Sequence, residues 1–191
     1  DATRVEVNTI SAEMAKVHDY VPPYAVMAHR GSTFWAPEET ESAWRWAREM
    51  GADYLESDLQ CTKDGVILAN HDDNLKRTTN IENVYSELVP ATRKAFYMRH
   101  GMSEAEAEKL VEADKASFRP YYAMSYMYEE LLALDAGSWF NETSIEQARE
   151  SFSEQHQYIS ALEDQIRYAE GKMLKRDVNG ERIYLSLIHI S

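Results

Sequence analysis

Histidines and carboxylates recur in the first half of the chain at a spacing that could support acid–base chemistry at a metal ion. His29 and His71 each follow a short apolar run, and Glu56 and Asp58 are two positions apart. Alternate residues of a β-strand point to the same side, so this carboxylate pair can reach one hard cation through oxygen ligands. Two histidines near the ion could divide proton transfer between them, with individual roles unassigned. The pattern favours Mg²⁺ or Ca²⁺ over zinc.

Each of these residues, taken singly, also has an ordinary structural explanation. A Glu-x-Asp pair on a strand is more often part of a solvated face, and a histidine at a strand end is more often a satisfied structural group. Arg30 has a planar charge suited to binding a phosphate, but it could equally pair with an acidic residue. The functional interpretation therefore depends on the order and spacing of the whole set.

Hydrophobic patterning predicts the elements that position these side chains. The apolar run 24–28 predicts a strand buried on both faces, and the helical spacing over 38–50 predicts a helix. Residues 54–59 alternate as a second strand, and the turn at 63–65 leads into a third. We expect this hairpin to return His71 towards the end of the first strand.

The segment from about 85 to 124 differs in composition, because it is rich in tyrosine and charge. Ser103 followed by Glu106 has the spacing of a capped helix start, so we predict a helical insertion. Beyond it the pattern predicts a helix over 128–134, a loop over 137–141 and a polar helical stretch over 143–155. A further helix is predicted over 160–171, capped by Ser160 with Glu163.

Composition restricts the class of protein. The 191 residues are 44% hydrophobic and 28% charged, which is typical of a soluble globular protein. The formal net charge of −13 would repel a nucleic acid, so we expect no such partner. No apolar run approaches the ~18 residues of a membrane-spanning helix. A single cysteine excludes a disulfide within these residues, and the oligomeric state is left open.

Together, the motifs resemble those of the glycerophosphodiester phosphodiesterases. The resemblance spans about residues 24–171 and is interrupted by the insertion. The matching motifs are His-Arg-Gly at 29–31, Pro-Glu-Glu-Thr at 37–40, Glu-x-Asp at 56–58, Lys-Asp-Gly at 63–65, His-Asp at 71–72, Arg-Thr-Thr at 77–79, and the segments 134–140 and 159–164.

The resemblance implies a TIM (β/α)₈ barrel, of which this chain would contain the first three or four βα units. It implies metal-dependent hydrolysis of a small glycerophosphodiester to an alcohol and glycerol 3-phosphate. Glu56 and Asp58 would bind one Ca²⁺ or Mg²⁺ with a third acidic ligand that this chain lacks. His29 and His71 would be the catalytic pair, and Arg30 would bind the phosphate. A periplasmic or secreted location is expected, with a cytoplasmic one as the alternative.

One motif departs from the family pattern, because Glu39 stands where the family has an asparagine. Glu38 and Glu39 are expected beside the metal ligands. The extra negative charge of Glu39 either adds a ligand or weakens the phosphate site.

The resemblance also suggests a division of the chain. Residues 1–23 are expected to form a leader and residues 24–184 a partial barrel domain. Residues 185–191 resemble the translation of a sequencing-adaptor end and are expected to be non-native. Taken locally, their Leu-Ile alternation would also pass as a β-strand.

Two other functional hypotheses stay open at this point. Related barrels cleave lysophospholipids or sphingomyelin, and nothing in these motifs distinguishes those substrates. Alternatively, the chain is an inactive truncated fragment whose unpaired strand edges lead to aggregation or partial folding.

Overall fold

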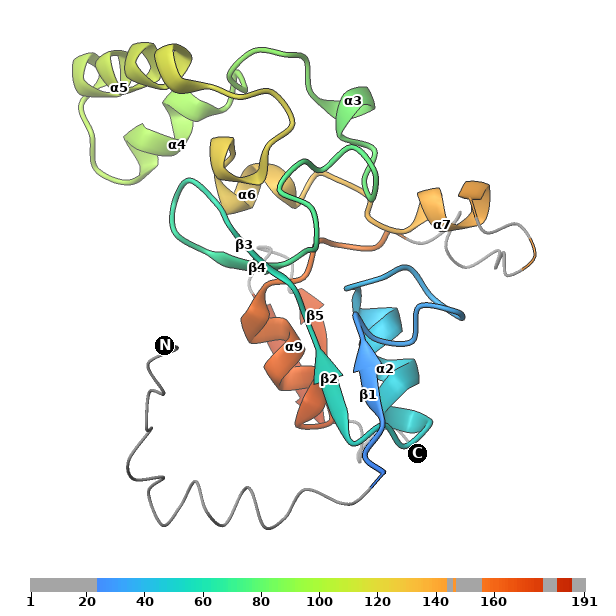
Figure 1. The fold of residues 1–191 in the computed structure, drawn as a ribbon. Helices are drawn as coiled ribbons and strands as arrows, with labels where there is room; N and C mark the ends of the chain where they lie inside the picture. The colour runs from blue at the N-terminus through green and yellow to red at the C-terminus, as the bar shows by residue number, and fades with distance from the viewer. Residues whose placement is uncertain (1–23, 144–145, 147–155, 177–181, 187–191) are drawn as a thin grey trace, which may run out of the picture.

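The computed structural model describes residues 24–143, 146, 156–176 and 182–186, so the leader predicted over 1–23 lies outside the described residues. Both helices and strands are present, which confirms the α/β class (Figure 1). In chain order the elements are β1 (Met27–His29), α2 (Glu41–Glu49), β2 (Tyr54–Glu56), β3 (Leu59–Cys61), β4 (Ile67–Ala69), α3 (Ile81–Val84), α4 (Arg93–Arg99), α5 (Glu104–Ser117), the 3₁₀ helix η1 (Ala123–Ser125), α6 (Tyr128–Leu131), α7 (Ser138–Thr143), α9 (Leu162–Ala169), β5 (Lys172–Arg176) and β6 (Arg182–Ser186).

The first three elements form a strand–helix–strand unit, as the sequence predicts. β1 and β2 pair in parallel, and the register sets His29 opposite Glu56. α2 makes the connection and begins after Thr40, whose hydroxyl oxygen accepts a hydrogen bond from the backbone N–H of Ala43. Its apolar face includes Trp44, which is fully buried. Because the strands are parallel, their C-terminal ends lie at the same edge.

The burial predicted for β1 is wrong. Val26 and Met27 are 59% and 62% exposed, whereas a strand buried on both faces would hide them. β1 has β2 as its neighbour on one edge, and no other described strand pairs with it. The described strands form three separate two-stranded sheets, β1–β2, β3–β4 and β5–β6, so closure into a barrel stays a prediction.

The predicted hairpin is confirmed. β3 and β4 pair antiparallel around a turn in which Gly65 has a φ of 84°, a conformation that favours glycine. β2 is shorter than the predicted strand, because Ser57 and Asp58 separate it from β3. At the end of the hairpin, the N–H of Asn70 donates to the carbonyl of Asp58 at 2.9 Å. The segment that contains His71 therefore starts beside Asp58.

The insertion is helical, as predicted, and contains α4 and α5. The Ser103 hydroxyl oxygen accepts from the Glu106 N–H at 3.4 Å, and the Glu106 carboxylate accepts from the Ser103 N–H at 2.9 Å. These reciprocal bonds confirm the predicted capping box.

Arg93 anchors the insertion to the rest of the chain. Its side chain is fully buried and donates to the carboxylates of Asp114 at 2.6 Å and Glu130 at 2.7 Å. Asp114 also pairs with Lys63 of the hairpin turn at 2.8 Å. Since each buried charge has an opposite partner, α4, α5 and α6 are held in one arrangement beside the hairpin.

Two predictions about the later helices are wrong. Residues 138–141 belong to α7 rather than to a loop. At the start of this helix the carboxylate of Asp135 accepts from the N–H groups of Gly137 and Ser138 at 2.9 and 3.2 Å. The cap of α9 lies one residue later than predicted. Ala161 is the N-cap, and Asp164 accepts its N–H at 2.8 Å. Most of the predicted polar helical stretch at 143–155 lies outside the described residues.

The C-terminal strands pair antiparallel, and β6 includes Leu185 and Ser186. Residues 187–191 lie outside the described part of the chain, so the domain boundary expected at residue 184 stays a prediction. Within the described residues, no helix has both the length and the apolar character needed to cross a lipid bilayer.

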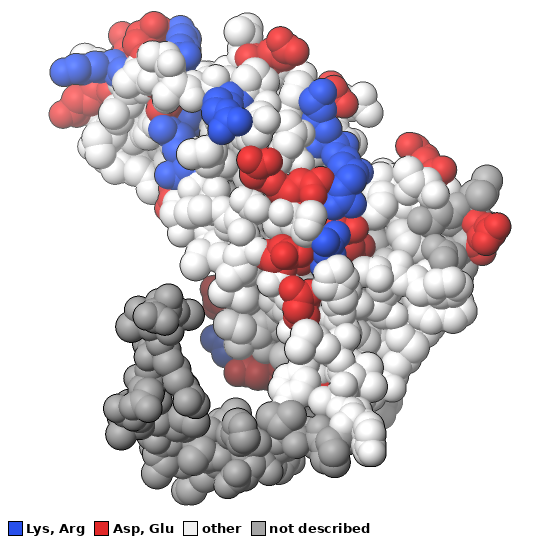
Figure 2. Space-filling model, viewed as in Figure 1, with Lys and Arg blue, Asp and Glu red and all other residues white. Residues whose placement is uncertain are grey.

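Charge is distributed unevenly over the surface. Acidic residues outnumber basic ones by 33 to 20 in the whole chain. On the face drawn in Figure 2, acidic and basic side chains nevertheless lie side by side in a band over the ends of β1 and β2. Opposite charges therefore neutralise one another locally at this edge.

Candidate active site

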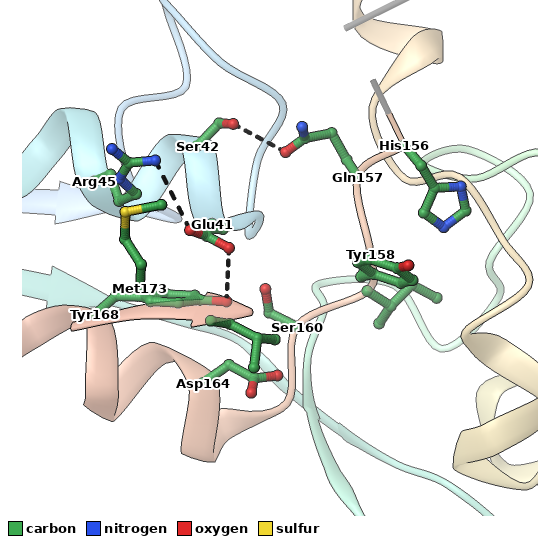
Figure 3. Close-up of a pocket in the computed structure, with 12 residues that line it drawn as sticks. Glu41, Ser42, Arg45, His156, Gln157, Tyr158, Ser160, Asp164, Tyr168 and Met173 are labelled. Carbon is green, nitrogen blue, oxygen red and sulfur yellow. Dashed lines mark hydrogen bonds and ion pairs between the residues drawn. The ribbon is translucent and has the colours of Figure 1, made fainter. Parts of the chain in front are cut away.

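A cavity of about 430 Å³ lies between α2, α9 and β5 (Figure 3). Its polar groups bond to one another: Tyr168 donates to Glu41 at 3.3 Å, and Ser42 donates to Gln157 at 2.9 Å. None of the predicted site residues lines it. Three of the predicted site residues, His29, Glu56 and Asp58, lie together elsewhere in the structure.

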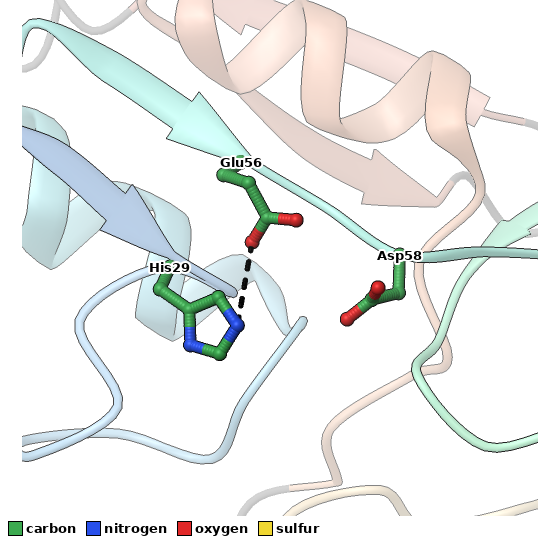
Figure 4. A group of neighbouring side chains, drawn as sticks. All are labelled: His29, Glu56 and Asp58. Atoms are coloured by element: carbon green, nitrogen blue, oxygen red, sulfur yellow. Dashed lines mark ion pairs between the residues drawn. The ribbon is translucent and has the colours of Figure 1, made fainter. Parts of the chain in front are cut away.

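At the C-terminal ends of β1 and β2, three predicted site residues come together (Figure 4). His29 Nε2 lies 4.0 Å from Glu56 Oε2, because the parallel register sets these residues opposite each other. Asp58 follows on the chain segment that leaves β2. One ligand atom from each of the three lies within 4.8 Å of the others, a spacing that could hold a metal ion. The His29 side chain is 69% exposed, so an incoming molecule can reach it.

The turn after β1 is fixed by its backbone. The N–H of Arg30 donates to both the carbonyl and the side chain of Glu56, at 3.1 and 3.0 Å. Arg30 has a φ of 57° and Gly31 a φ of 87°. A Cβ on Gly31 would lie 2.7 Å from the Cβ of Ala43, so only glycine fits there without a shift of α2.

Glu39 is held beside the metal-ligand candidates, as the sequence predicts. It is 4% exposed, and its Oε1 accepts the N–H of Asp58 at 2.8 Å. Its own N–H donates to the carbonyl of Arg30 at 3.0 Å, and its φ is 56°. Its second oxygen is buried and has no hydrogen-bond partner. Burial raises the pKa of Glu39 to about 8, and the charges of Asp58, Glu38 and Glu56 add to this shift.

The Arg30 side chain contacts two carboxylates. Its Nε lies 3.1 Å from Asp58 Oδ2, and an Nη lies 3.3 Å from Glu38 Oε1. The contact with Asp58 is an ion pair without the direction of a hydrogen bond. Arg30 therefore pairs with acidic residues, which was the structural alternative to a role in binding. Its binding of phosphate stays a prediction.

His71 lies outside the three-residue cluster. Its Nδ1 is 2.5 Å from Asp72 Oδ1, and its carbonyl accepts from the side-chain amide of Gln60 at 3.0 Å. Its side chain is 43% exposed. Asp72 received no role from the sequence, although an acid directly after a histidine is a signal that could have indicated one.

Arg77 also received no role from the sequence, and it joins Asp72 to Glu38. Its guanidinium donates to both oxygens of Glu38, at 2.7 and 3.0 Å, and to Asp72 at 2.7 Å. Hydrogen bonds from Arg77 are the main cause that lowers the pKa of Asp72 to about 2. Burial opposes ionisation of Glu38, but Arg77 and Arg30 together lower its pKa.

The donor set at the strand ends fits a hard divalent cation. Glu56 and Asp58 supply carboxylate oxygens, and the imidazole of His29 lies beside them. Glu39 adds a third carboxyl group nearby, and one of its oxygens is buried without a hydrogen-bond partner. The arrangement is that of an α/β protein with a possible metal site beside an exposed histidine.

The sequence profile of the glycerophosphoryl diester phosphodiesterase family matches residues 29–190, and the chain belongs to this family. A glycerophosphodiester phosphodiesterase of Bacillus subtilis (strain 168) is 32% identical over 126 residues, which are 66% of this chain and 30% of that protein. One from Caldanaerobacter subterraneus is 49% identical over 57 residues, which are 30% of this chain and 24% of that protein.

The crystal structure of the glycerophosphodiester phosphodiesterase from Agrobacterium tumefaciens is 26% identical, with a TM-score of 0.47, and the match covers 77% of this chain and 43% of that one. The chain spans less than a third of the length of the curated relatives that it matches.

The left-handed backbone of Glu39 leads to a first prediction. Glu39→Gly and Glu39→Ala both remove the carboxylate, but only alanine retains the strain of a positive φ. We expect the glycine variant to be more stable by about 1 kcal/mol. Urea unfolding of the two variants, made in the protein expressed from its complete gene, measures the difference. Equal stability would show that this backbone is not strained.

The pKa of Glu39 leads to a second prediction. The folded protein retains a proton that the unfolded chain, with a usual value of 4.5, releases. The stability from this group is therefore fully present below about pH 4.5 and is lost as the pH rises to about 8. Relative to Glu39→Gln, the wild type should lose at most about 1.4 kcal/mol per pH unit in that window. Urea unfolding at several pH values, in a chelator, checks this, and parallel curves would contradict it.

Proposed function

We propose that the protein is a metal-dependent phosphodiesterase that hydrolyses glycerophosphodiesters to an alcohol and glycerol 3-phosphate. The observation that supports this best is the convergence of His29, Glu56 and Asp58 at the end of the parallel strands, in a chain of this family. A bound Ca²⁺ or Mg²⁺ would supply Lewis-acid stabilisation of the phosphate.

The chain's own residues would then divide the remaining work. In the reaction, water attacks phosphorus and the bond from phosphorus to the alcohol oxygen breaks. If a hydroxyl of the glycerol group attacks instead, the alcohol leaves and a cyclic phosphate remains, which water then opens to glycerol 3-phosphate. One histidine of the pair His29 and His71 would accept the proton of the nucleophile, and the other would protonate the leaving oxygen. Arg30, next to Asp58, would contribute positive charge near the phosphate.

The proposal includes a division of the site between this chain and residues outside it. Met27 of β1 is 62% exposed, and β1 pairs with one described strand, so we propose that further barrel strands and a third acidic ligand complete the site. On this proposal, residues 1–191 alone are inactive and aggregate or fold partially, whereas the product of the complete gene is active. Activity of soluble, cooperatively melting residues 1–191 would refute the division.

A third prediction tests the activity itself. Hydrolysis of glycerophosphocholine by the protein expressed from its complete gene should require a divalent ion and stop in EDTA. His29→Ala and His71→Ala should each lower kcat by roughly 10²–10⁴-fold, because each removes a proton-transfer group. His100→Ala is the matched control, since His100 ends α4 and stacks on Phe96 away from the strand ends. Undiminished activity in EDTA would exclude the role of a metal.

A lysophospholipid or sphingomyelin substrate is the second candidate, and one surface feature favours it. Phe34 and Trp35, on the segment after His29, are 57% and 38% exposed and pack edge to face. Trp35 also stacks on Trp46, at 6.2 Å between ring centroids. Such a cluster could contact an acyl chain.

A fourth prediction follows from this cluster. If the substrate is acylated, lysophosphatidylcholine should be hydrolysed at a higher kcat/KM than glycerophosphocholine, and Phe34→Ala should remove most of that preference by raising KM. Kinetics with a panel of diesters measure it. Preference for the substrate without an acyl chain would exclude the second candidate.

A further inference from the structure

A row of alternating charges connects the metal-ligand candidate Asp58 with His71. The row contains acidic and basic side chains in strict alternation, and its members in order are Asp58, Arg30, Glu38, Arg77, Asp72 and His71. Glu38 lies between Arg30 and Arg77. Asp72 lies between Arg77 and His71. The row therefore connects the segment after β2, which contains Asp58, with the segment after β4, which contains His71.

Glu38 is the centre of the row. Its side chain is 13% exposed and is shared by two arginines, with Arg30 at 3.3 Å and Arg77 at 2.7 Å from the same oxygen. Its other oxygen accepts a second bond from Arg77 at 3.0 Å. This paired contact between a planar guanidinium and a carboxylate fixes orientation as well as distance.

Arg77 fixes the orientation of Asp72 in the same way. Its Nε and an Nη contact the two oxygens of Asp72 at 2.7 and 3.2 Å. The residues that it joins are far apart in sequence, since Glu38 precedes α2 and Asp72 follows the hairpin. Arg77 thus holds the segment after β4 against the segment after β1.

The orientation of Asp72 determines which nitrogen of His71 has the proton. An ionised carboxylate can only accept, so His71 Nδ1, at 2.5 Å, must be the donor. Asp72 is ionised at neutral pH because its pKa is lowered to about 2. The neutral ring then has an unprotonated Nε2, which is the nitrogen available for a reacting group.

We propose that Glu38 and Arg77 are positioning residues that hold Asp72 so that His71 keeps its Nδ1–H tautomer and a fixed ring orientation. The consequence for turnover depends on the proposed phosphodiesterase function, but the consequence for the imidazole does not. Neither residue touches the substrate in this mechanism. Both act through His71, and a small misplacement of a reacting group can cost about 10²-fold in rate.

The first experiment measures the imidazole directly. Nitrogen-15 NMR of the metal-free protein, expressed from its complete gene at a pH where His71 is neutral, distinguishes the two tautomers. The wild type should show Nδ1–H, and Arg77→Met should shift His71 towards Nε2–H. Lys76→Met is the matched control, because Lys76 pairs with Glu82 and should leave the signal unchanged. Arg77→Lys keeps the positive charge but cannot make the paired guanidinium contacts, so it should shift the tautomer signal of His71 only partially.

The second experiment measures turnover of glycerophosphocholine. Arg77→Met and Glu38→Gln should each lower kcat by about 10–100-fold, as outer partners of catalytic groups do, with little change in KM. Because the two act through one contact, the double variant should be no worse than the poorer single variant. Lys76→Met should keep the wild-type kcat.

The outcomes separate this inference from the proposed function. A wild-type tautomer signal in both Arg77→Met and Arg77→Lys would overturn the inference, even if kcat fell. A tautomer shift in a protein that hydrolyses no diester would support the positioning role and refute the phosphodiesterase. If Arg77→Met does not fold, the signal of Arg77→Lys decides between the two results.

Discussion

The site depends on the parallel pairing of β1 with β2 in one register. That register places His29 opposite Glu56, and the next N–H, from Arg30, donates to Glu56. A shift by one residue would turn Glu56 to the other side of the sheet, away from His29. His29 and Glu56 thus owe their proximity to the backbone hydrogen bonds of this strand pair.

Strained backbone and a buried carboxyl group accompany this pairing. Arg30 and Glu39 both have a positive φ, and the N–H of Glu39 donates to the carbonyl of Arg30. Glu39 in turn accepts the N–H of Asp58, so three chain segments are tied together where their side chains converge. Backbone strain of this kind persists only where neighbouring contacts enforce it, and it concentrates at functional sites.

The second half of the site is attached by side chains rather than by a sheet. His71 lies beyond the hairpin, and the pairs of Arg77 with Glu38 and Asp72 hold its segment in place. Behind the hairpin, the buried Arg93 fixes the helical insertion through Asp114, which also contacts Lys63. One edge therefore combines a candidate metal site, formed by strands, with a histidine held by ion pairs. This arrangement is consistent with the different roles in proton transfer that are proposed for the two histidines.

The sequence by itself determined the local elements and the family. Alternation and helical spacing predicted β1, α2, the hairpin and the capping box at Ser103, because these depend on neighbours within a few residues. The order of motifs identified His29, Glu56 and Asp58. It did not predict the exposure of β1 or any role for Asp72 and Arg77. Those features depend on contacts between segments tens of residues apart, and only the tertiary structure decides which carboxylate each arginine meets.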